Sequence, residues 1–152
     1  MSDLQRVVLR SIGLLGVILV AGCSSGEAGG KVSGTVTENG TAVAAAKITF
    51  MGAPQGDKPG PQFMAKTDDQ GKYSLIVADP TKGVPSGPYK VTVVKYAPKK
   101  GAKMPDENDI DQMVVAGLVT ITTPRIYADP EKTPLKADVV TGSNTVDLQL
   151  KK

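Results

Sequence analysis

The sequence predicts an all-β protein, a two-sheet β-sandwich of seven strands preceded by a signal helix. Three observations support this class. From residue 31 onward apolar residues alternate with polar ones in seven short stretches, proline (11) and glycine (17) are abundant, and long helix-forming stretches are missing. Strands with one apolar and one polar side are typical of sheets that pack face to face over a core.

The first 22 residues have the layout of a secretory signal. Arg6 and Arg10 precede an apolar segment, and the small residues Ala21 and Gly22 end it. The uninterrupted apolar stretch, residues 11–22, is shorter than the roughly 20 residues that a membrane-spanning helix needs. We therefore expect a cleaved signal helix over residues 1–22. A permanent transmembrane anchor and a plain secretory signal are the alternatives.

Cys23, the single cysteine, directly follows Gly22. This arrangement resembles the bacterial lipoprotein signal, which implies cleavage between Gly22 and Cys23, a diacylglyceryl group on the thiol and an acyl group on the freed amine. Two or more acyl chains give stable membrane attachment. In the sorting scheme that the resemblance implies, Ser24 after the cysteine favours the outer over the inner membrane, on the exported side.

The processed chain has 130 residues (152 − 22), enough for one domain with its own core. Removing two basic residues and one acidic residue with the signal leaves 16 − 14 = +2, too weak a charge to indicate nucleic-acid binding. Residues 23–30, rich in serine and glycine after the cysteine, are expected to form a flexible tether. The sandwich is expected over residues 31–152.

The first two strands are expected at 31–37 and 46–51. Their predicted inward residues are Val32, Gly34 and Val36, then Ala46, Ile48 and Phe50. Asn39-Gly40 between them tolerates positive φ and predicts a turn. Residues 52–61 contain three prolines and three glycines and are expected to form a loop.

Five further strands are expected at 62–67, 72–77, 89–96, 135–140 and 145–150. The predicted inward residues are Tyr73, Leu75, Val77, Tyr89, Val91, Val93, Leu135, Ala137, Val139, Val146, Leu148 and Leu150. Residues 68–71 and 141–144 are expected to form turns.

Three groups of residues resemble the carboxypeptidase regulatory-like domain. They are Gly30-Lys31-Val32-Ser33-Gly34-Thr35-Val36, the turn Thr67-Asp68 to Gly71-x-Tyr73, and Pro88-Tyr89-Lys90-Val91-Thr92-Val93. The stretch from Pro124 and Tyr127 through Thr133 and Leu135 to Gly142 and Asn144 resembles its bacterial lipoprotein version. The resemblance implies the seven-stranded Greek-key fold of prealbumin (transthyretin), without peptidase activity or shared catalytic residues.

Residue types argue against catalysis and metal binding. The chain has no histidine, which removes the commonest general base and transition-metal ligand. Cys23 is expected to be consumed by lipid, so we predict no catalytic residue, metal or other cofactor. At Asp68-Asp69-Gln70-Gly71, an EF-hand calcium loop would need Glu where Asp79 stands, so a hairpin turn is the better interpretation.

A long insert, residues 97–124, interrupts the sandwich. Loops of this length are functional or disordered. We predict a partner-contact arm with Lys99, Lys100, Lys103, Asp106, Glu107, Leu118 and Ile121 as candidate contacts. Two alternatives remain: the opposite charges pair with each other, or Asp106, Glu107, Asp109 and Asp111 hold a metal.

The sequence thus favours a non-catalytic, lipid-anchored envelope protein that binds a protein or a cell-wall glycan. A structural spacer and an enzyme of unrecognised type are the alternatives. Tyr96 and Tyr127 fall outside the predicted inward positions, and exposed rings can stack on sugars, but two are too few to predict a carbohydrate platform.

Overall fold

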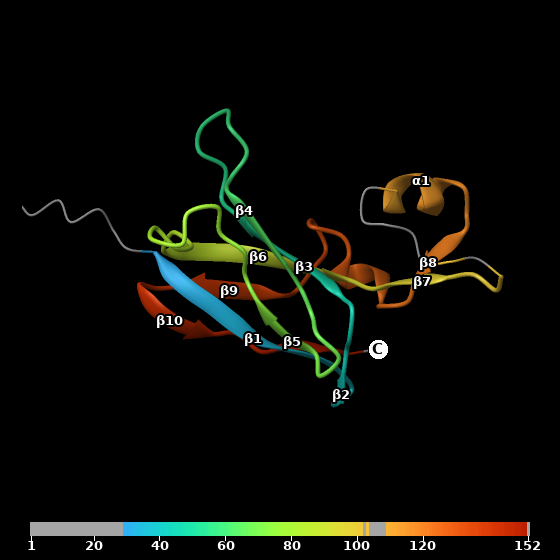
Figure 1. The fold of residues 1–152 in the computed structure, drawn as a ribbon. Helices are drawn as coiled ribbons and strands as arrows, with labels where there is room; N and C mark the ends of the chain where they lie inside the picture. Colours follow the sequence, from blue (N-terminus) through green and yellow to red (C-terminus); the bar gives the residue numbers. More distant parts are fainter. Residues whose placement is uncertain (1–28, 102, 104–108, 152) are drawn as a thin grey trace, which may run out of the picture.

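The computed structural model describes residues 29–101, 103 and 109–151, without the side chain of Asp111. The predicted signal helix, Cys23, Ser24, Asp106 and Glu107 lie outside this part. The described residues form an all-β protein with one short α-helix (Figure 1). Among them, no helix has the length and apolar character needed to cross a bilayer.

The first sheet is built around β1 (Gly30–Glu38). Strands β10 (Gly142–Thr145) and β11 (Leu148–Leu150) pair with it in parallel. Strands β2 (Thr41–Ala42) and β5 (Lys72–Ser74) pair with it in antiparallel orientation. The turn between β1 and β2 contains Asn39 and Gly40 with φ of 49° and 84°, as the sequence predicted.

The second sheet has the order β4-β3-β6-β9 and is antiparallel throughout. Its strands are β4 (Gln62–Lys66), β3 (Lys47–Gly52), β6 (Gly87–Val94) and β9 (Lys136–Val139). The remaining elements are β7 (Tyr96–Pro98), α1 (Ile110–Val115), β8 (Val119–Ile121) and the 3₁₀ turn η1 (Arg125–Tyr127). The described residues therefore form eleven strands, several of only two or three residues, against the seven expected.

The core lies between the two sheets and contains side chains from both. The predicted inward residues on β1, β3, β6, β9 and β11 are buried apart from the half-buried Gly34. Phe50 lies at the centre, with its ring centroid 6.2 Å from those of Tyr73 and Tyr89. The alternation of apolar and polar residues thus predicted correctly which side chains are buried. The predicted class, a two-sheet β-sandwich, is also confirmed.

The C-terminal pairing differs from the prediction. Residues 142–144, expected in a turn, begin β10, and the expected strand 145–150 is broken at Val146 and Asp147. The Asn144 side chain explains the change: its Oδ1 accepts from the Val140 amide at 2.9 Å, and its Nδ2 donates to the Val140 carbonyl at 2.7 Å. Asn144 closes the corner by which the chain leaves β9 in one sheet for β10 in the other.

Other predicted boundaries also shift. Strand β5 ends at Ser74, after which the Ile76 amide donates to the Met64 carbonyl of β4 at 3.0 Å. Strand β6 ends at Val94, so Tyr96 belongs to β7. The predicted tether, residues 23–30, extends two residues too far. Gly30 is buried in β1, and the Gly29 amide is also hydrogen-bonded to the body.

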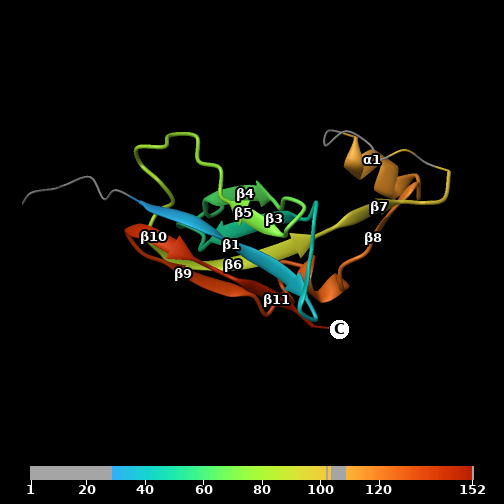
Figure 2. The same ribbon diagram turned by 60° about the horizontal axis from the view of Figure 1, so that its bottom comes forward.

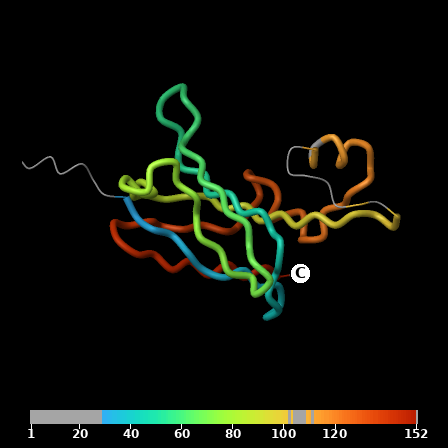
Figure 3. The backbone as a smooth tube through the Cα atoms, viewed as in Figure 1, coloured from blue at the N-terminus to red at the C-terminus, as the bar shows by residue number. Residues whose placement is uncertain are grey.

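The two ends of the molecule differ in structure. Strand β1 begins at one end, and β7, β8 and α1 project from the other in both ribbon views (Figures 1 and 2). The tube follows the chain out along β7 and back along β8 (Figure 3). The insert is therefore an extension of the sandwich and not a strand added to one of its edges.

Candidate functional site

The projecting segment, residues 96–121, is called the arm below. Strands β7 and β8 pair antiparallel, with Tyr96 opposite Ile121 and Pro98 opposite Val119. One further bond extends this ribbon outward, since the Lys99 amide donates to the Leu118 carbonyl at 2.9 Å. The described residues of the predicted insert thus form a two-stranded ribbon with a helix beside it.

Helix α1 ends in a Schellman motif. Gly117 has φ of 68° and donates to the Val114 carbonyl at 3.0 Å, and the Leu118 amide donates to the Met113 carbonyl at 2.9 Å. A six-residue helix is not stable alone in water. Val119 of β8 is 4% exposed and lies outside the main core cluster, and β8 contacts α1. This local burial at Val119 is called the small second core of the arm below.

Three aliphatic residues of the arm are exposed to solvent. Val115 is 89% exposed, Leu118 43% and Val114 38%. Val114 and Val115 end α1, and Leu118 follows three positions after Val115. An exposed apolar group of this kind on a projecting element is typical of a protein contact surface.

The structure brings only some of the predicted contact residues to this surface. Leu118 is part of it, and Lys99 lies beside it, because its Nζ is 3.6 Å from the position that a Cβ on Gly117 would occupy. Lys100 and Lys103 are exposed. Ile121 is half-buried and shares the strand face of Val119. Asp106 and Glu107, and with them the alternative of a four-carboxylate metal site, lie outside the described residues.

The root of the arm is held by threonine hydroxyls. The Lys95 carbonyl accepts from the Thr122 amide at 2.9 Å and from the Thr122 hydroxyl at 3.2 Å. The Thr123 hydroxyl accepts from the Lys95 amide and donates to the Val93 carbonyl, both at 3.3 Å. Because Thr123 is buried, its bond to the Val93 carbonyl is shielded from water, and the bonds together fix the arm to the end of β6.

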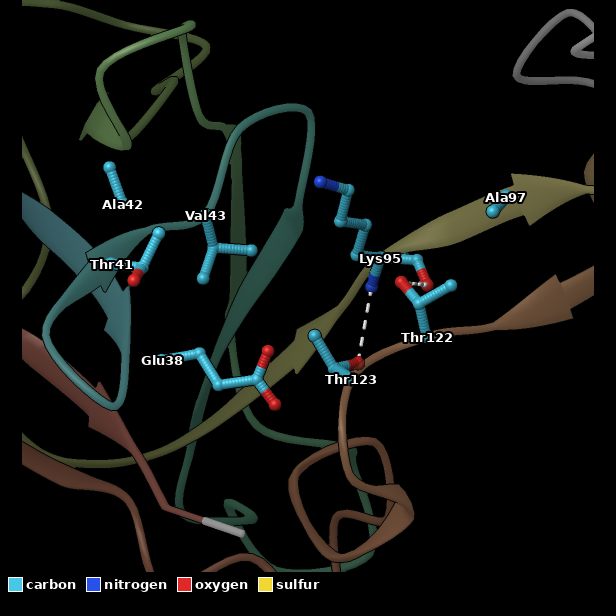
Figure 4. Close-up of a pocket in the computed structure, with 8 residues that line it drawn as sticks. All are labelled: Glu38, Thr41, Ala42, Val43, Lys95, Ala97, Thr122 and Thr123. Atoms are coloured by element: carbon cyan, nitrogen blue, oxygen red, sulfur yellow. Dashed lines mark hydrogen bonds between the residues drawn. The ribbon is translucent and has the colours of Figure 1, made fainter.

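A pocket of about 530 Å³ lies at this root (Figure 4). The hairpin between β1 and β2 supplies one wall with Glu38 and Thr41, and the arm root supplies the other with Lys95. The Glu38 carboxylate is directed towards Thr123 in the close-up (Figure 4). One carboxylate, one ammonium group and hydroxyls surrounding small apolar residues suit polar contacts with a partner.

A second hollow of similar volume, about 530 Å³, lies over the outer face of the second sheet. Met51, Pro54, Pro88 and Pro130 give it an apolar lining. The Lys90 ammonium lies 3.7 Å from a Glu131 carboxylate oxygen at its rim. Sequence reasoning missed this hollow, because its lining comes from four segments that only the fold brings together.

The titratable groups with shifted pKa values have structural explanations. Burial raises the pKa of Tyr73, and the Asp147 carboxylate raises it further, while the Tyr73 hydroxyl donates to the Val146 carbonyl at 2.6 Å. Burial also raises the pKa of Tyr89. The hydroxyl of Thr81 lowers the pKa of the exposed Asp79 by donating to it.

The Asp68 turn matches the predicted hairpin. Its carboxylate accepts from the Gln70 amide at 2.9 Å and the Lys72 amide at 2.8 Å, and Gly71 has φ of 75°. In the described part of the chain, no three acidic or cysteine side chains are grouped in a way that could hold a metal ion.

All six aromatic residues lie in the described part, and none is fully exposed. Tyr127, expected outside the core, is 5% exposed. Its hydroxyl accepts from the Lys151 amide at 2.8 Å and donates to the Lys151 carbonyl at 3.2 Å, so it fixes the C-terminus. Tyr96 is half-buried in the arm. The chain therefore has no exposed pair of rings on which a sugar could stack.

Comparisons with known proteins add little to this geometry. No protein-family model matches the chain, and no curated protein matches it. Among solved structures, it is similar to chlorocatechol 1,2-dioxygenase from Pseudomonas putida, with a TM-score of 0.35 and 14% identity. The match covers 86% of this chain and 62% of the enzyme's chain. At that TM-score the likeness carries no argument about fold or activity.

Proposed function

We propose that this chain is a lipid-anchored bacterial envelope protein that acts by binding another protein, with the arm as its contact surface. The signal, with Cys23 at its end, supplies the anchor, and the body belongs to the carboxypeptidase regulatory-like, prealbumin-type Greek-key group. The anchor places the protein at the outer membrane, on the exported side. The proposal includes no catalytic role.

One observation carries the binding role: the arm presents Val114, Val115 and Leu118 to solvent on an element with its own small core. Exposing these residues opposes folding and solubility unless a partner covers them. The bonds between Lys95, Thr122 and Thr123 hold the arm in a defined position, which lowers the entropy cost of binding.

A protein partner is favoured over a glycan. Glycan recognition relies on exposed aromatic rings, and every ring of this chain is buried or half-buried. Aliphatic side chains flanked by lysines are instead typical of protein interfaces with an apolar centre and a polar rim.

Site-specific photo-crosslinking in intact cells tests the proposal. A photoreactive amino acid at position 118 is expected to give a discrete protein adduct. Val115→Glu is expected to lower its yield at least tenfold, since burying one valine contributes about 1.5 kcal/mol or more. Ile76→Glu, at a 74% exposed residue on the body, is the matched control and is expected to leave the adduct unchanged.

The alternatives give different results. An adduct that cell-wall hydrolases release would indicate a glycan partner. Absence of any discrete adduct at position 118 would favour the structural spacer. Turnover in a hydrolase screen of the purified chain would indicate an enzyme and contradict the proposal.

A further inference from the structure

We propose that the end of the sandwich at which β1 begins rests on the lipid surface through Lys31, Lys82 and Val140. The inference rests on the proposed function, because it takes the lipid to be on Cys23. The inference goes beyond the proposed function because it assigns a second surface, whose partner is the membrane. It also fixes the direction in which the arm points.

The chain enters the body between two segments of this end. The Gly29 amide donates to the Lys82 carbonyl, and the Gly30 amide donates to the Val84 carbonyl at 2.7 Å. On the other side, Gly30 is in register with Gly142 of β10. A Cβ at Gly30 would approach the Asn144 amide and Val139 to within 2.8 Å, so the chain passes through a site that admits only glycine.

This attachment limits how far the end can stand from the membrane. Five residues, 24–28, separate Cys23 from Gly29, and the six Cα–Cα steps span at most about 20 Å when fully extended. The nine residues of β1 then run about 30 Å towards the opposite end, where the arm projects (Figures 1 and 2). The end near Gly29 is therefore the one that the tether presents to lipid.

The side chains around Gly29 suit an anionic lipid surface. The Lys82 side chain is 81% exposed, and Lys31 next to Gly30 is also exposed. Val140 is 59% exposed, although its neighbour Val139 is in the core. The Asp79 carboxylate lies 3.7 Å from the Lys82 Nζ and accepts bonds from Thr81. Among the described side chains named here, two ammonium groups are therefore accompanied by one carboxylate.

A weak contact is sufficient here because the body is tethered. A short flexible linker gives an effective concentration in the millimolar range. Each lysine near an anionic surface contributes about a fivefold gain in membrane binding. Val140 adds apolar contact at the headgroup boundary. The anchored body is thus oriented, with the arm directed away from the membrane and accessible to its partner.

Fluorescence quenching on vesicles tests this orientation with the full chain. The protein is purified from bacterial membranes and reconstituted into phosphatidylethanolamine–phosphatidylglycerol vesicles with a new cysteine, either Thr141→Cys or Val115→Cys. Each is labelled with a thiol-reactive fluorophore. A lipid-borne quencher at headgroup depth is expected to quench the label at position 141 severalfold more than that at position 115. Equal quenching, or stronger quenching at 115, overturns the inference.

Charge variants test the contact itself. Lys31→Gln with Lys82→Gln is expected to reduce quenching at position 141 severalfold, as are vesicles of phosphatidylcholine alone. Lys58→Gln with Lys72→Gln, two exposed lysines outside both proposed surfaces, is the matched control and is expected to change nothing. If both pairs behave alike, the proposed surface is wrong.

Labelling stoichiometry separates the two proposals. With lipid on Cys23, each chain takes one fluorophore. Two fluorophores per chain would show a free Cys23 and overturn the lipid anchor, and the orientation with it. One fluorophore with no preferential quenching at position 141 would overturn the orientation alone.

Discussion

Gly34 of β1 lies opposite the break between β10 and β11. The substitution Gly34→Ala therefore tests the parallel pairing that joins the C-terminal strands to β1. A Cβ at this position would collide with the Val146 carbonyl oxygen. That carbonyl is fixed, because it accepts the Tyr73 hydroxyl at 2.6 Å and the Val146 amide donates to the Ser33 carbonyl at 2.8 Å. Alanine can therefore be accommodated only by moving backbone and disrupting the Tyr73 bond.

The expected cost follows from these contacts. Overpacking costs about 1–3 kcal/mol, and an unsatisfied buried hydroxyl about 1–3 kcal/mol. The lower entropy of the unfolded alanine chain offsets about 0.4–1 kcal/mol. We expect a net loss of about 3 kcal/mol in the free energy of unfolding, which shifts the urea midpoint by about 1–3 M.

Urea unfolding of the chain from Ser24 onward, followed by circular dichroism, measures this loss. Tyr73→Phe removes only the hydrogen bond and is expected to cost less than Gly34→Ala. Because both changes act on the Val146 carbonyl, the double variant is expected to cost less than the sum of the two. A Gly34→Ala protein within about 0.5 kcal/mol of the wild type would refute the close approach of β1 to the strand break.

Three further outcomes are expected. Val119→Ala should speed hydrogen exchange in the arm, because it removes about 2 kcal/mol of local stability. The exposed-site control Val115→Ala should leave exchange unchanged. Equal effects of the two substitutions would contradict the second core at Val119. Thr123→Val should destabilise the arm root by about 1–3 kcal/mol, seen as faster exchange in β7 and β8, and unchanged exchange there would count against the hydroxyl bridge. The pKa of Tyr73 is raised in the folded chain, so its contribution to folding stability is fully present below about pH 10 and is lost above it, as Tyr73 ionises in the unfolded chain. Above that pH the melting temperature should fall more steeply for the wild type than for Tyr73→Phe. Parallel pH profiles of the two proteins would disprove the role of burial.

Burial was the part of the fold that could be predicted. Alternation identified Val32, Ile48, Phe50 and Val91 as inward because a strand that covers a core must have one apolar face. Pairing could not be predicted in the same way. Gly142-Ser143-Asn144 has the composition of a turn, and only the side-chain bonds of Asn144 to Val140 make it the start of a strand parallel to β1.

The candidate site was predicted in position but not in form. Length and mixed charge led to the prediction of a contact segment at the insert, and its contact role stays a prediction. Its helix was missed because six residues give too little periodicity. A usable signal was present: Gly117 followed by the apolar Leu118 after an apolar run is the pattern of a Schellman helix end. The root pocket had no such signal, since Glu38 and Lys95 are far apart in the chain.

The central claim is that acyl chains on Cys23 hold the protein at the membrane. Metabolic labelling with palmitate and membrane fractionation of cells that express either the wild type or Cys23→Ala tests it most directly. The account predicts that the wild type incorporates palmitate and sediments with membranes, whereas Cys23→Ala takes up no label and becomes soluble. Sedimentation of Cys23→Ala equal to that of the wild type would contradict it.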